Sequence, residues 1–316
     1  MKIKLFTHND LDGVGCGVLA KLAFGDDVDI SYCGYNNINE EVKKYLESGL
    51  INGVIHITDI SVTEEVAELL NKSGVPVILL DHHKTALYLN KYKWANVKEY
   101  MNDSSLKTSG TQLYFDYLCD EGFYEPWNMH VYDFVEKVRM YDTWDWAESG
   151  EYGLVSKQMN DLLGLYGRDR FIDWSISKII DPRLFISLEK EDKHLLEMHQ
   201  KQIDDYIDQK NKQLFATTLC GRPCGVVYAD KYFSEMGNRL AELHPEYDFI
   251  TMIDVGGGMV SYRTIREDID LGEIAKVFGG GGHPKAAGSR FPGSTGVAIM
   301  EMIFSLTLGN LQEGLV

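Results

Sequence analysis

The first hundred residues alternate short apolar runs with segments of helical periodicity, and this alternation limits the possible folds more than any other feature of the chain. Strands that alternate with amphipathic helices form parallel sheets with crossover connections. The runs and helical patterns follow one another at 3–7, 13–24, 53–58, 63–73 and 75–80. The sequence therefore predicts an α/β domain with a parallel sheet, in which ligands bind beyond the carboxyl ends of the strands.

A long charged segment at 187–214 divides the chain, and its apolar positions recur at helical spacing, which predicts a connecting helix. We expect three parts: a metal-binding catalytic domain at 1–186, the helical linker at 187–214, and a smaller α/β domain at 215–316. Further helices are predicted at 108–118, 127–140 and 234–243, and strands at 214–219, 225–229, 249–255 and 259–264. The turn Gly221-Arg222-Pro223 is a hairpin signal between two of these strands. The aromatic-rich stretch 141–174 has no clear period, so no element is predicted there.

The charge balance argues against long nucleic acids as partners. The chain has 31 basic and 48 acidic residues, a net charge of −17, and a polyanion would be repelled. We therefore expect a small anionic ligand and no long double-stranded nucleic acid. The first residues are too charged for a secretory signal and no apolar run is long enough to cross a bilayer, so we expect a cytoplasmic protein without a membrane partner. Five scattered cysteines lack paired CxxC spacing and are expected to be reduced thiols.

Three polar residues that alternate in sequence follow the first predicted strand. His8, Asp10 and Asp12 would lie on one side of an extended segment. Such closely packed groups repel one another unless a cation is present, which favours a metal site. An alternative is a turn that caps the following helix, with Asp12 as the N-cap and Gly13 easing the turn. The sequence of this cluster alone leaves both interpretations open.

A second cluster, Asp81-His82-His83-Lys84, follows another predicted strand. It offers a metal ligand and a group that could contact a phosphate, and the alternative is a helix N-terminus with solvated histidines. Asp59 ends the strand between the two clusters, so it would lie between them at the same sheet edge. An aspartate in that position could bridge two metal ions.

The order His8, Asp10, Asp12, Asp59 and Asp81-His82-His83 resembles the DHH phosphoesterases. The segment GGGGHPKAAG at 279–288 is similar to the glycine signature of the associated DHHA1 domain. Two distant signatures in the expected order are more specific than either alone. Within the family, HNDLDGVGCG at 8–17 resembles the opening of the nanoRNase-type oligoribonucleases, and the RecJ nucleases are more distant relatives.

The resemblance implies two bound metal ions. One would be held by His8, Asp10 and Asp59, and the other by Asp12, Asp59, His82 and Asp142. The last assignment rests on Tyr141-Asp142-Thr143, with Asp133 and Asp145 as alternatives. Oxygen and imidazole ligands without thiolate suit Mn²⁺, with Mg²⁺ or Co²⁺ as alternatives. His83 and Asp81 are the expected catalytic residues.

The same resemblance implies a substrate site on the second domain. Its expected residues are Arg263, Gly280, Gly281, Gly282, His283 and Lys285. Lys84 of the first domain is expected to contact the substrate as well. A helix starting near Pro284 would add its dipole to the binding of a phosphate. The predicted function is a two-metal-dependent hydrolase of short oligonucleotides that releases nucleoside monophosphates.

Two alternatives remain for the function. The substrate could be a small nucleotide, namely 3′-phosphoadenosine 5′-phosphate, a cyclic dinucleotide or its linear product. The chain could also be a non-catalytic nucleotide- or RNA-binding regulator, although a full set of metal ligands argues against this. A homodimer is left open.

Overall fold

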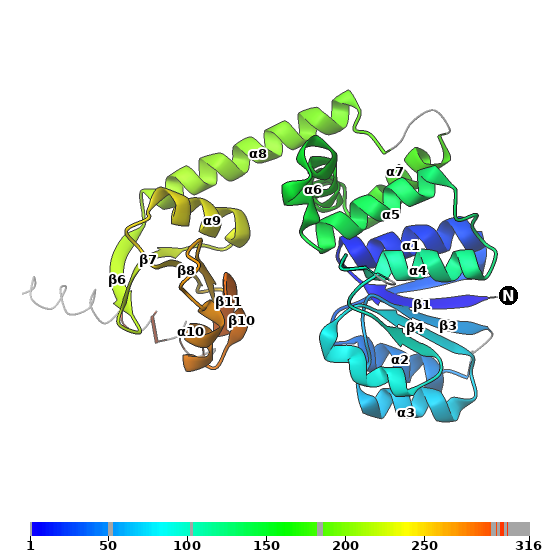
Figure 1. Ribbon diagram of the computed structural model, residues 1–316. Coiled ribbons are helices and arrows are strands. Elements are labelled where there is room, and N and C mark those ends of the chain that lie inside the picture. Colours follow the sequence, from blue (N-terminus) through cyan, green and yellow to red (C-terminus); the bar gives the residue numbers. More distant parts are fainter. Residues whose placement is uncertain are drawn as a thin grey trace, which may run out of the picture. The chain divides into compact units, whose positions relative to one another are not determined.

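The computed structural model describes residues 2–49, 53–101, 104–181 and 186–291, with a few isolated residues beyond 291. The chain forms two compact units, Met1–Leu196 and Glu197–Val316. Each unit has its own sheet and its own hydrophobic core. They are described one after the other, and both can be followed in Figure 1.

The first unit contains a five-stranded sheet in which every neighbouring pair is parallel. The strand order is β2-β1-β3-β4-β5. The strands are β1 (Ile3–His8), β2 (Val28–Cys33), β3 (Val54–Thr58), β4 (Val77–Asp81) and β5 (Ala95–Val97). The predicted α/β class with a parallel sheet is confirmed, and three of the strands were predicted from the sequence.

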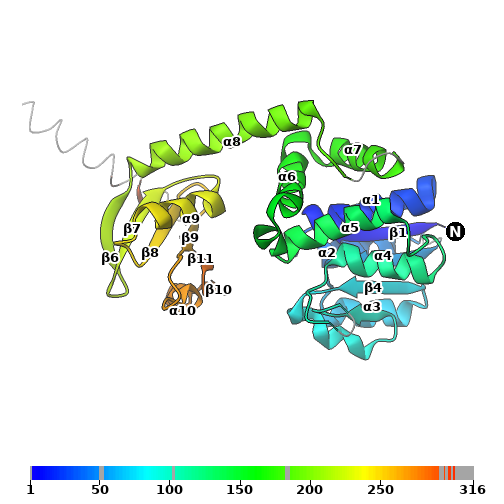
Figure 2. The ribbon, with the colours of Figure 1, turned by 45° about the horizontal axis from the view of Figure 1, so that its top comes forward.

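Helices cover both faces of this sheet. One face carries α1 (Leu11–Phe24), α4 (Gly110–Asp120) and α5 (Met129–Asp142), and the other carries α2 (Ile38–Glu47) and α3 (Glu64–Ser73) (Figure 1). The stretch for which no element was predicted forms the short turn η3 (Asp145–Glu148) and the helices α6 (Gly150–Tyr166) and α7 (Arg168–Ile180), which Figure 2 shows beside α5 and α1. Two further short helical turns are η1 (Gly25–Asp27) and η2 (Lys84–Lys91).

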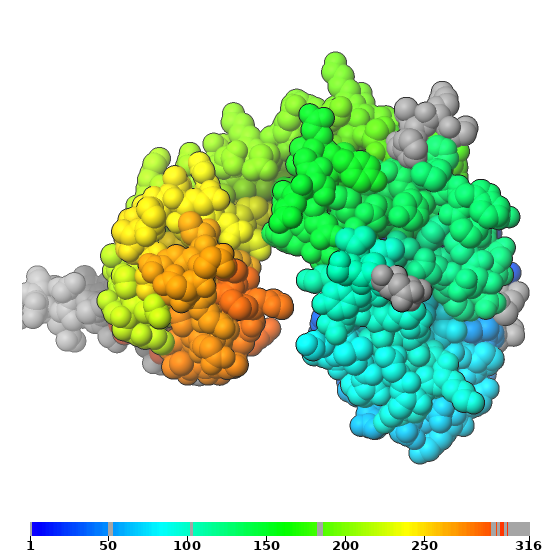
Figure 3. Space-filling view, in the orientation of Figure 1, coloured from blue at the N-terminus to red at the C-terminus, as the bar shows by residue number. Residues whose placement is uncertain are grey.

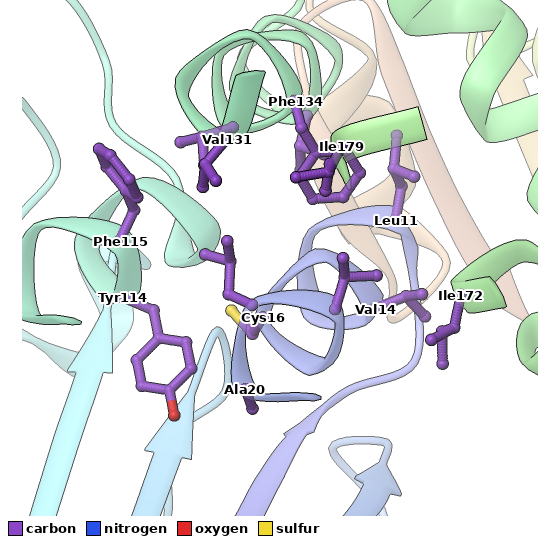
Figure 4. Close-up of a cluster of buried hydrophobic side chains, with 14 of the residues drawn as sticks. Leu11, Val14, Cys16, Ala20, Tyr114, Phe115, Val131, Phe134, Ile172 and Ile179 are labelled. Atoms are coloured by element: carbon purple, nitrogen blue, oxygen red, sulfur yellow. The ribbon is translucent and has the colours of Figure 1, made fainter. Parts of the chain in front are cut away.

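Because both faces are covered, each strand buries side chains on both sides. Neighbouring residues Leu5 and Phe6 of β1 belong to different core clusters, one under α1 and α4 and the other under α2 and α3. Figure 4 shows part of the first cluster, where Val14, Tyr114 and Phe134 converge from three helices. The sheet is therefore fixed from both sides, and the carboxyl ends of its strands are held on a rigid scaffold.

The second unit begins within α8 (Lys190–Asn211), the helix predicted at 187–214. Its sheet has the order β10-β11-β9-β8-β7-β6 and contains one parallel pair, β7 with β8. The strands are β6 (Phe215–Leu219), β7 (Arg222–Tyr228), β8 (Phe249–Asp254), β9 (Met259–Arg263), β10 (Gly281–His283) and β11 (Ala286–Arg290). The helices are α9 (Phe233–Leu243) and α10 (Leu271–Val277).

Two predictions for this unit are wrong in detail. The hairpin between β6 and β7 turns at Cys220 and Gly221, which both have positive φ, so Arg222 and Pro223 lie in β7. No helix starts near Pro284, because Pro284 and Lys285 connect the antiparallel strands β10 and β11. The expected helix dipole is therefore absent from that segment.

Among the helices of the described ranges, none combines the length and the apolar composition that a bilayer-crossing segment needs.

Candidate metal centre

The carboxyl ends of three adjacent strands bring the predicted ligands to one edge of the sheet. His8 is the last residue of β1, Asp59 follows β3, and Asp81 ends β4. The sheet order places β1, β3 and β4 side by side. Asp142, the last residue of α5, reaches the same edge from one covering helix.

The first group consists of His8, Asp10 and Asp59. Each offers a ligand atom within 4.8 Å of the others. The His8 Nδ1 atom lies 2.7 Å from Asp10 Oδ2 and 3.9 Å from Asp59 Oδ2. These are the three residues that the family resemblance implied for one metal ion.

The second group surrounds the His82 Nε2 atom. This nitrogen lies 3.2 Å from Asp59 Oδ1 and 3.6 Å from the Oδ2 atoms of both Asp12 and Asp142. Asp59 therefore takes part in both groups, with one oxygen toward each. Its Oδ2 atom is buried and has no hydrogen-bond partner among the residues that the structure describes.

The electrostatics of this cluster are unfavourable without a cation. Burial and the carboxylates of Asp12 and Asp10 hold the pKa of Asp59 well above its usual value. Burial and the same two neighbours raise the pKa of Asp142 to about 8. Divalent cations would neutralise these groups, and the donors are oxygen and imidazole without thiolate, which fits ions such as Mn²⁺ or Mg²⁺.

Local backbone geometry places the first group. Asp10 is the N-cap of α1 and accepts a hydrogen bond from the Gly13 N–H at 3.1 Å. Asp12 lies inside the first turn of α1, so the alternative in which Asp12 caps the helix is wrong. A Cβ atom at Gly13 would lie 2.1 Å from the His8 carbonyl oxygen, so only glycine lets the helix start this close to the end of β1.

The N-terminus of α4 holds Asp12, a contact that the sequence analysis missed. The Gly110 N–H donates to Asp12 Oδ2 at 2.6 Å, and the Thr111 N–H donates to Oδ1 at 2.8 Å. The Thr111 hydroxyl donates to the Asp12 carbonyl oxygen at 2.6 Å. Ser109 before an apolar run is a helix N-cap signal, but the sequence does not indicate which carboxylate the helix would meet.

Asp81 and His83 form a hydrogen-bonded pair beside the two groups. Asp81 Oδ1 lies 2.7 Å from His83 Nδ1 and also accepts from the His82 N–H, while Asp81 Oδ2 accepts from the Ser61 hydroxyl. With both oxygens occupied, Asp81 is poorly suited to bind a metal, although it lies close to Asp59 and His82. Burial disfavours protonation of His83, but the hydrogen bond and charge of Asp81 outweigh it and raise the pKa of His83.

Three other acidic or basic candidates lie outside these groups. Lys84 is exposed at the start of η2. The alternatives to Asp142 are paired elsewhere, because Asp133 contacts the Lys137 ammonium and Asp145 contacts Arg139.

In the second unit, the structure brings Arg263 and His283 onto one face of the sheet. Ala286 of β11 is directly opposite Arg263 of β9 and also opposite His283 of β10. Directly opposite residues project to the same face, and only the small alanine separates the two cationic candidates. The Arg263 guanidinium donates to Ser234 Oγ at 3.1 Å and to the Tyr262 carbonyl oxygen at 2.9 Å.

The glycine segment is explained largely by backbone packing. A Cβ atom would lie 2.0 Å from the Gly288 carbonyl oxygen if placed on Gly280, and 2.5 Å from Ala287 Cα if placed on Gly282. Gly281 has open space around it within the described part of the chain. Lys285 lies 2.9 Å from Glu267, so its ammonium already has an acidic neighbour.

Comparison with known proteins gives relatives in sequence and in structure. No family model matches the chain. The oligoribonuclease NrnB of Bacillus subtilis is 41% identical over 290 residues, which are 90% of this chain and 71% of that protein. RecJ of Thermus thermophilus in complex with Mn²⁺ has a TM-score of 0.59 at 15% identity, covering 95% of this chain and 51% of RecJ.

A third relative is PggH of Vibrio cholerae, described as a pGpG-specific phosphodiesterase. Its TM-score is 0.50 at 15% identity, covering 96% of this chain and 98% of PggH. The structural matches show a shared fold, and the identity to NrnB shows a closer relationship. The chain belongs to the DHH phosphoesterases, in the family that includes the oligoribonuclease NrnB.

Proposed function

We propose that this protein is a divalent-metal-dependent phosphodiesterase that hydrolyses short oligonucleotides and releases nucleoside monophosphates. The observation that carries the proposal is the presence of two adjacent clusters of carboxylate and imidazole side chains, which share Asp59. The relative at 41% identity is named an oligoribonuclease, and PggH is named a phosphodiesterase of a linear dinucleotide. A dinucleotide is the shortest member of the substrate class that we propose.

We propose His8, Asp10 and Asp59 as ligands of one ion, and Asp12, Asp59, His82 and Asp142 as ligands of the other. Manganese is the proposed metal, since a RecJ structure of the same fold carries it. Bound divalent ions at such a site supply Lewis acidity, which activates water and stabilises charge on phosphoryl oxygens. The protein positions the ligands for this chemistry through the ends of β1, β3 and β4 and the N-terminus of α4.

His83 and Asp81 are proposed to act on the reacting phosphate. Asp81 Oδ1 accepts a hydrogen bond from the His83 Nδ1–H, which fixes the ring and directs Nε2 away from the carboxylate. A protonated Nε2 can donate a hydrogen bond to a phosphoryl oxygen or a proton to the leaving oxygen. Against the effect of burial, the hydrogen bond and charge of Asp81 raise the pKa of His83, which supports this role because it favours the protonated ring.

We also propose that residues 1–186 form the catalytic domain, 187–214 the linker, and 215–316 the substrate-holding domain. Arg263 and His283 project from one sheet face and would hold a phosphate of the substrate. Burial lowers the pKa of Arg263, and no salt bridge is formed by this side chain among the described residues. A bound phosphate would supply the missing negative charge. Lys84, Lys285 and Gly281 remain further candidates.

The test is a digestion panel of 5′-labelled RNA from two to ten residues, together with a 20-residue RNA, in Mn²⁺ and in EDTA. We expect hydrolysis that depends on Mn²⁺, favours the shortest substrates and yields nucleoside monophosphates. The Asp59→Asn variant should lose activity by about 1,000-fold or more, since both ions lose a shared ligand. Asp169→Asn, which removes an exposed carboxylate from α7, is the matched control.

Product analysis separates the alternatives. Equal rates on two-residue and 20-residue RNA would contradict the preference for short substrates. Hydrolysis of 3′-phosphoadenosine 5′-phosphate or a cyclic dinucleotide, without hydrolysis of linear RNA, would assign the site to small nucleotides. A folded protein that binds Mn²⁺ but cleaves none of these compounds would contradict the proposed enzyme function.

A further inference from the structure

A cavity of about 210 Å³ lies directly beside the candidate metal centre. The loops that follow β2, β3 and β4 surround it, and the first turns of α2 and η2 complete it. Aromatic and polar side chains line its wall, among them Tyr35, Asn39, Thr63, His83 and Tyr88. Apart from Asp81 and His83, no residue of this wall has been given a role above.

His83 separates the cavity from the metal ligands. Its ring lines the cavity and lies 4.4 Å, centroid to centroid, from the ring of the proposed ligand His82. Tyr35 contacts both sides, since its ring lies 6.0 Å from His83 and 5.0 Å from His8. The cavity is therefore close enough to the candidate metal centre for one small molecule to reach both.

The two tyrosines at this wall, Tyr35 and Tyr88, present open aromatic surfaces. Tyr35 is 61% exposed and Tyr88 is 44% exposed, although large aromatic residues are usually buried more deeply. Their positions are fixed, because the Tyr35 hydroxyl lies 3.1 Å from His83 Nε2 and the Tyr88 hydroxyl donates to the Val62 carbonyl oxygen at 2.9 Å. Figure 3 shows the surface of the first unit, on which the part of the chain near residue 90 is coloured cyan. Fixed and open rings are suited to stacking.

The polar part of the wall favours a neutral ligand with hydrogen-bonding edges. Both oxygens of the carboxylate in the wall, Asp81, are occupied by protein donors. The Asn39 Oδ1 atom accepts from the Thr63 N–H at 2.8 Å and from its hydroxyl at 3.1 Å. The Asn39 amino group is thus the end of the amide that can serve a ligand, and the exposed Thr85 hydroxyl adds a second donor or acceptor.

We propose that this cavity binds the nucleoside attached to the scissile phosphate, with its base stacked on Tyr35 or Tyr88. Stacking on an aromatic ring accepts every base, because each base has a π-face. The cavity therefore contributes affinity for nucleotides without reading sequence. This inference deepens the proposed function and rests on it.

The experiment compares a 5′-phosphorylated diadenylate with two analogues in which one adenine is replaced by hydrogen. For the wild-type protein, removal of the base that occupies the cavity should lower kcat/KM by about tenfold, within the range measured for stacking on one aromatic ring. In Tyr35→Ala the intact substrate should lose a similar factor, mainly through a higher KM, and removal of the base should then have little further effect. Such non-additivity measures a direct interaction between the ring and the base.

Two variants separate stacking from other effects of Tyr35. Tyr35→Phe keeps the ring and removes the hydroxyl near His83, so it should keep the wild-type ratio between intact and base-free substrates. Tyr228→Ala removes a tyrosine of similar exposure from β7 and should also keep this ratio. Tyr88→Leu tests the second ring.

The inference is overturned if Tyr35→Ala and Tyr88→Leu both retain the wild-type ratio, or if Tyr35→Phe loses the ratio as fully as Tyr35→Ala. If the wild-type protein cleaves none of the three compounds, the proposed function fails separately. Calorimetry with the same compounds then tests whether the cavity binds the base. An affinity that depends on the base, and that Tyr35→Ala abolishes, would support the inference. Equal affinities of the wild-type protein for all three would exclude it.

Discussion

Asp59 combines three features that oppose folding and that a bound cation would compensate. Its backbone is left-handed with φ of 56°, its side chain is buried, and its charge faces other carboxylates. Left-handed backbone is costly for most residues but tolerated by Asn and Asp. Asparagine at this position therefore removes the charge without adding backbone strain.

We predict that Asp59→Asn raises the melting temperature of the metal-free protein and abolishes most of its stabilisation by Mn²⁺. Relief of charge repulsion worth about 1 kcal/mol corresponds to roughly 2–4 °C for a domain of this size. Thermal unfolding in EDTA and in excess Mn²⁺ measures both effects. A variant that is less stable than the wild type in EDTA, or that keeps the full Mn²⁺ shift, would contradict the prediction.

His56 gives a prediction for acid stability. It is buried in β3, with its Nδ1 atom 2.8 Å from the Tyr114 hydroxyl, and burial lowers its pKa to about 3. In the unfolded chain a histidine has a pKa of about 6.5. Between these two values the unfolded chain binds the proton and the folded chain does not, so stability falls as the pH drops below about 6.5 and this loss ends near pH 3.

The expected slope is about 1.4 kcal/mol for each pH unit, or about 2 kcal/mol between pH 6.5 and pH 5. His56→Gln retains a partner for Tyr114 and cannot titrate. Denaturant unfolding at pH 7 and pH 5 should therefore show a smaller loss of stability at pH 5 for the variant. Parallel losses in the two proteins would show that His56 does not contribute.

At the scale of single residues, the sequence predicts those site residues that follow directly after strands. His8, Asp59 and His82 come together because parallel strands end at one edge, and apolar runs followed by polar residues indicate that edge. Tyr35 and Gly110 could not be predicted in the same way. Their contacts join segments that are far apart in the chain, and no local pattern specifies which partner they meet.

At the scale of elements, the candidate metal centre depends most on the position of α4, whose N-terminus contacts Asp12 and Asp59. Its first residue, Gly110, packs so tightly that an added Cβ atom would lie 2.4 Å from Asp59 Cβ and 2.8 Å from Asp59 Cα. The same residue donates its N–H to Asp12. A side chain there would displace Asp59, the proposed ligand of both ions.

We predict that Gly110→Ala destabilises the protein by about 1–3 kcal/mol, as overpacking does, and weakens Mn²⁺ binding. Gly164→Ala is the matched control, because Gly164 lies in α6 and an added Cβ atom would meet no described heavy atom within 4 Å. That control should gain about 0.5–1 kcal/mol, since alanine favours helix more than glycine does. Thermal unfolding and Mn²⁺ titration of both variants test the prediction. Equal stability and equal Mn²⁺ affinity of the two variants would refute the packing argument.

Two elements show why part of the fold was not predicted. Strand β2 (Val28–Cys33) has only one fully buried residue and lies at the edge of the sheet, so its apolar signal is weak. The helix expected near Pro284 fails for a different reason. Because Gly280 and Gly282 have no side chain, β11 can approach their backbone more closely than any other residue would permit. This packing stabilises the hairpin of β10 and β11.

The net charge of −17 acts at the scale of the whole molecule, because it sets how polyanions of different length approach. Repulsion grows with the charge of the substrate, so a 20-residue RNA is disfavoured far more than a dinucleotide. Salt screens this repulsion, since the Debye length falls from about 30 Å at 0.01 M to about 10 Å at 0.1 M. A protein that binds nucleic acid through a basic surface shows the opposite salt dependence.

We therefore predict that raising KCl from about 0.01 M to 0.1 M increases kcat/KM for the 20-residue RNA severalfold and changes the value for the dinucleotide much less. Both substrates are measured at one fixed Mn²⁺ concentration, so that occupancy of the metal centre is the same and the dinucleotide serves as the internal control. A steep fall of the 20-residue rate with salt would show that a local basic surface outweighs the net charge. A ratio between the two substrates that is independent of salt would assign the preference for short substrates to the shape of the site alone.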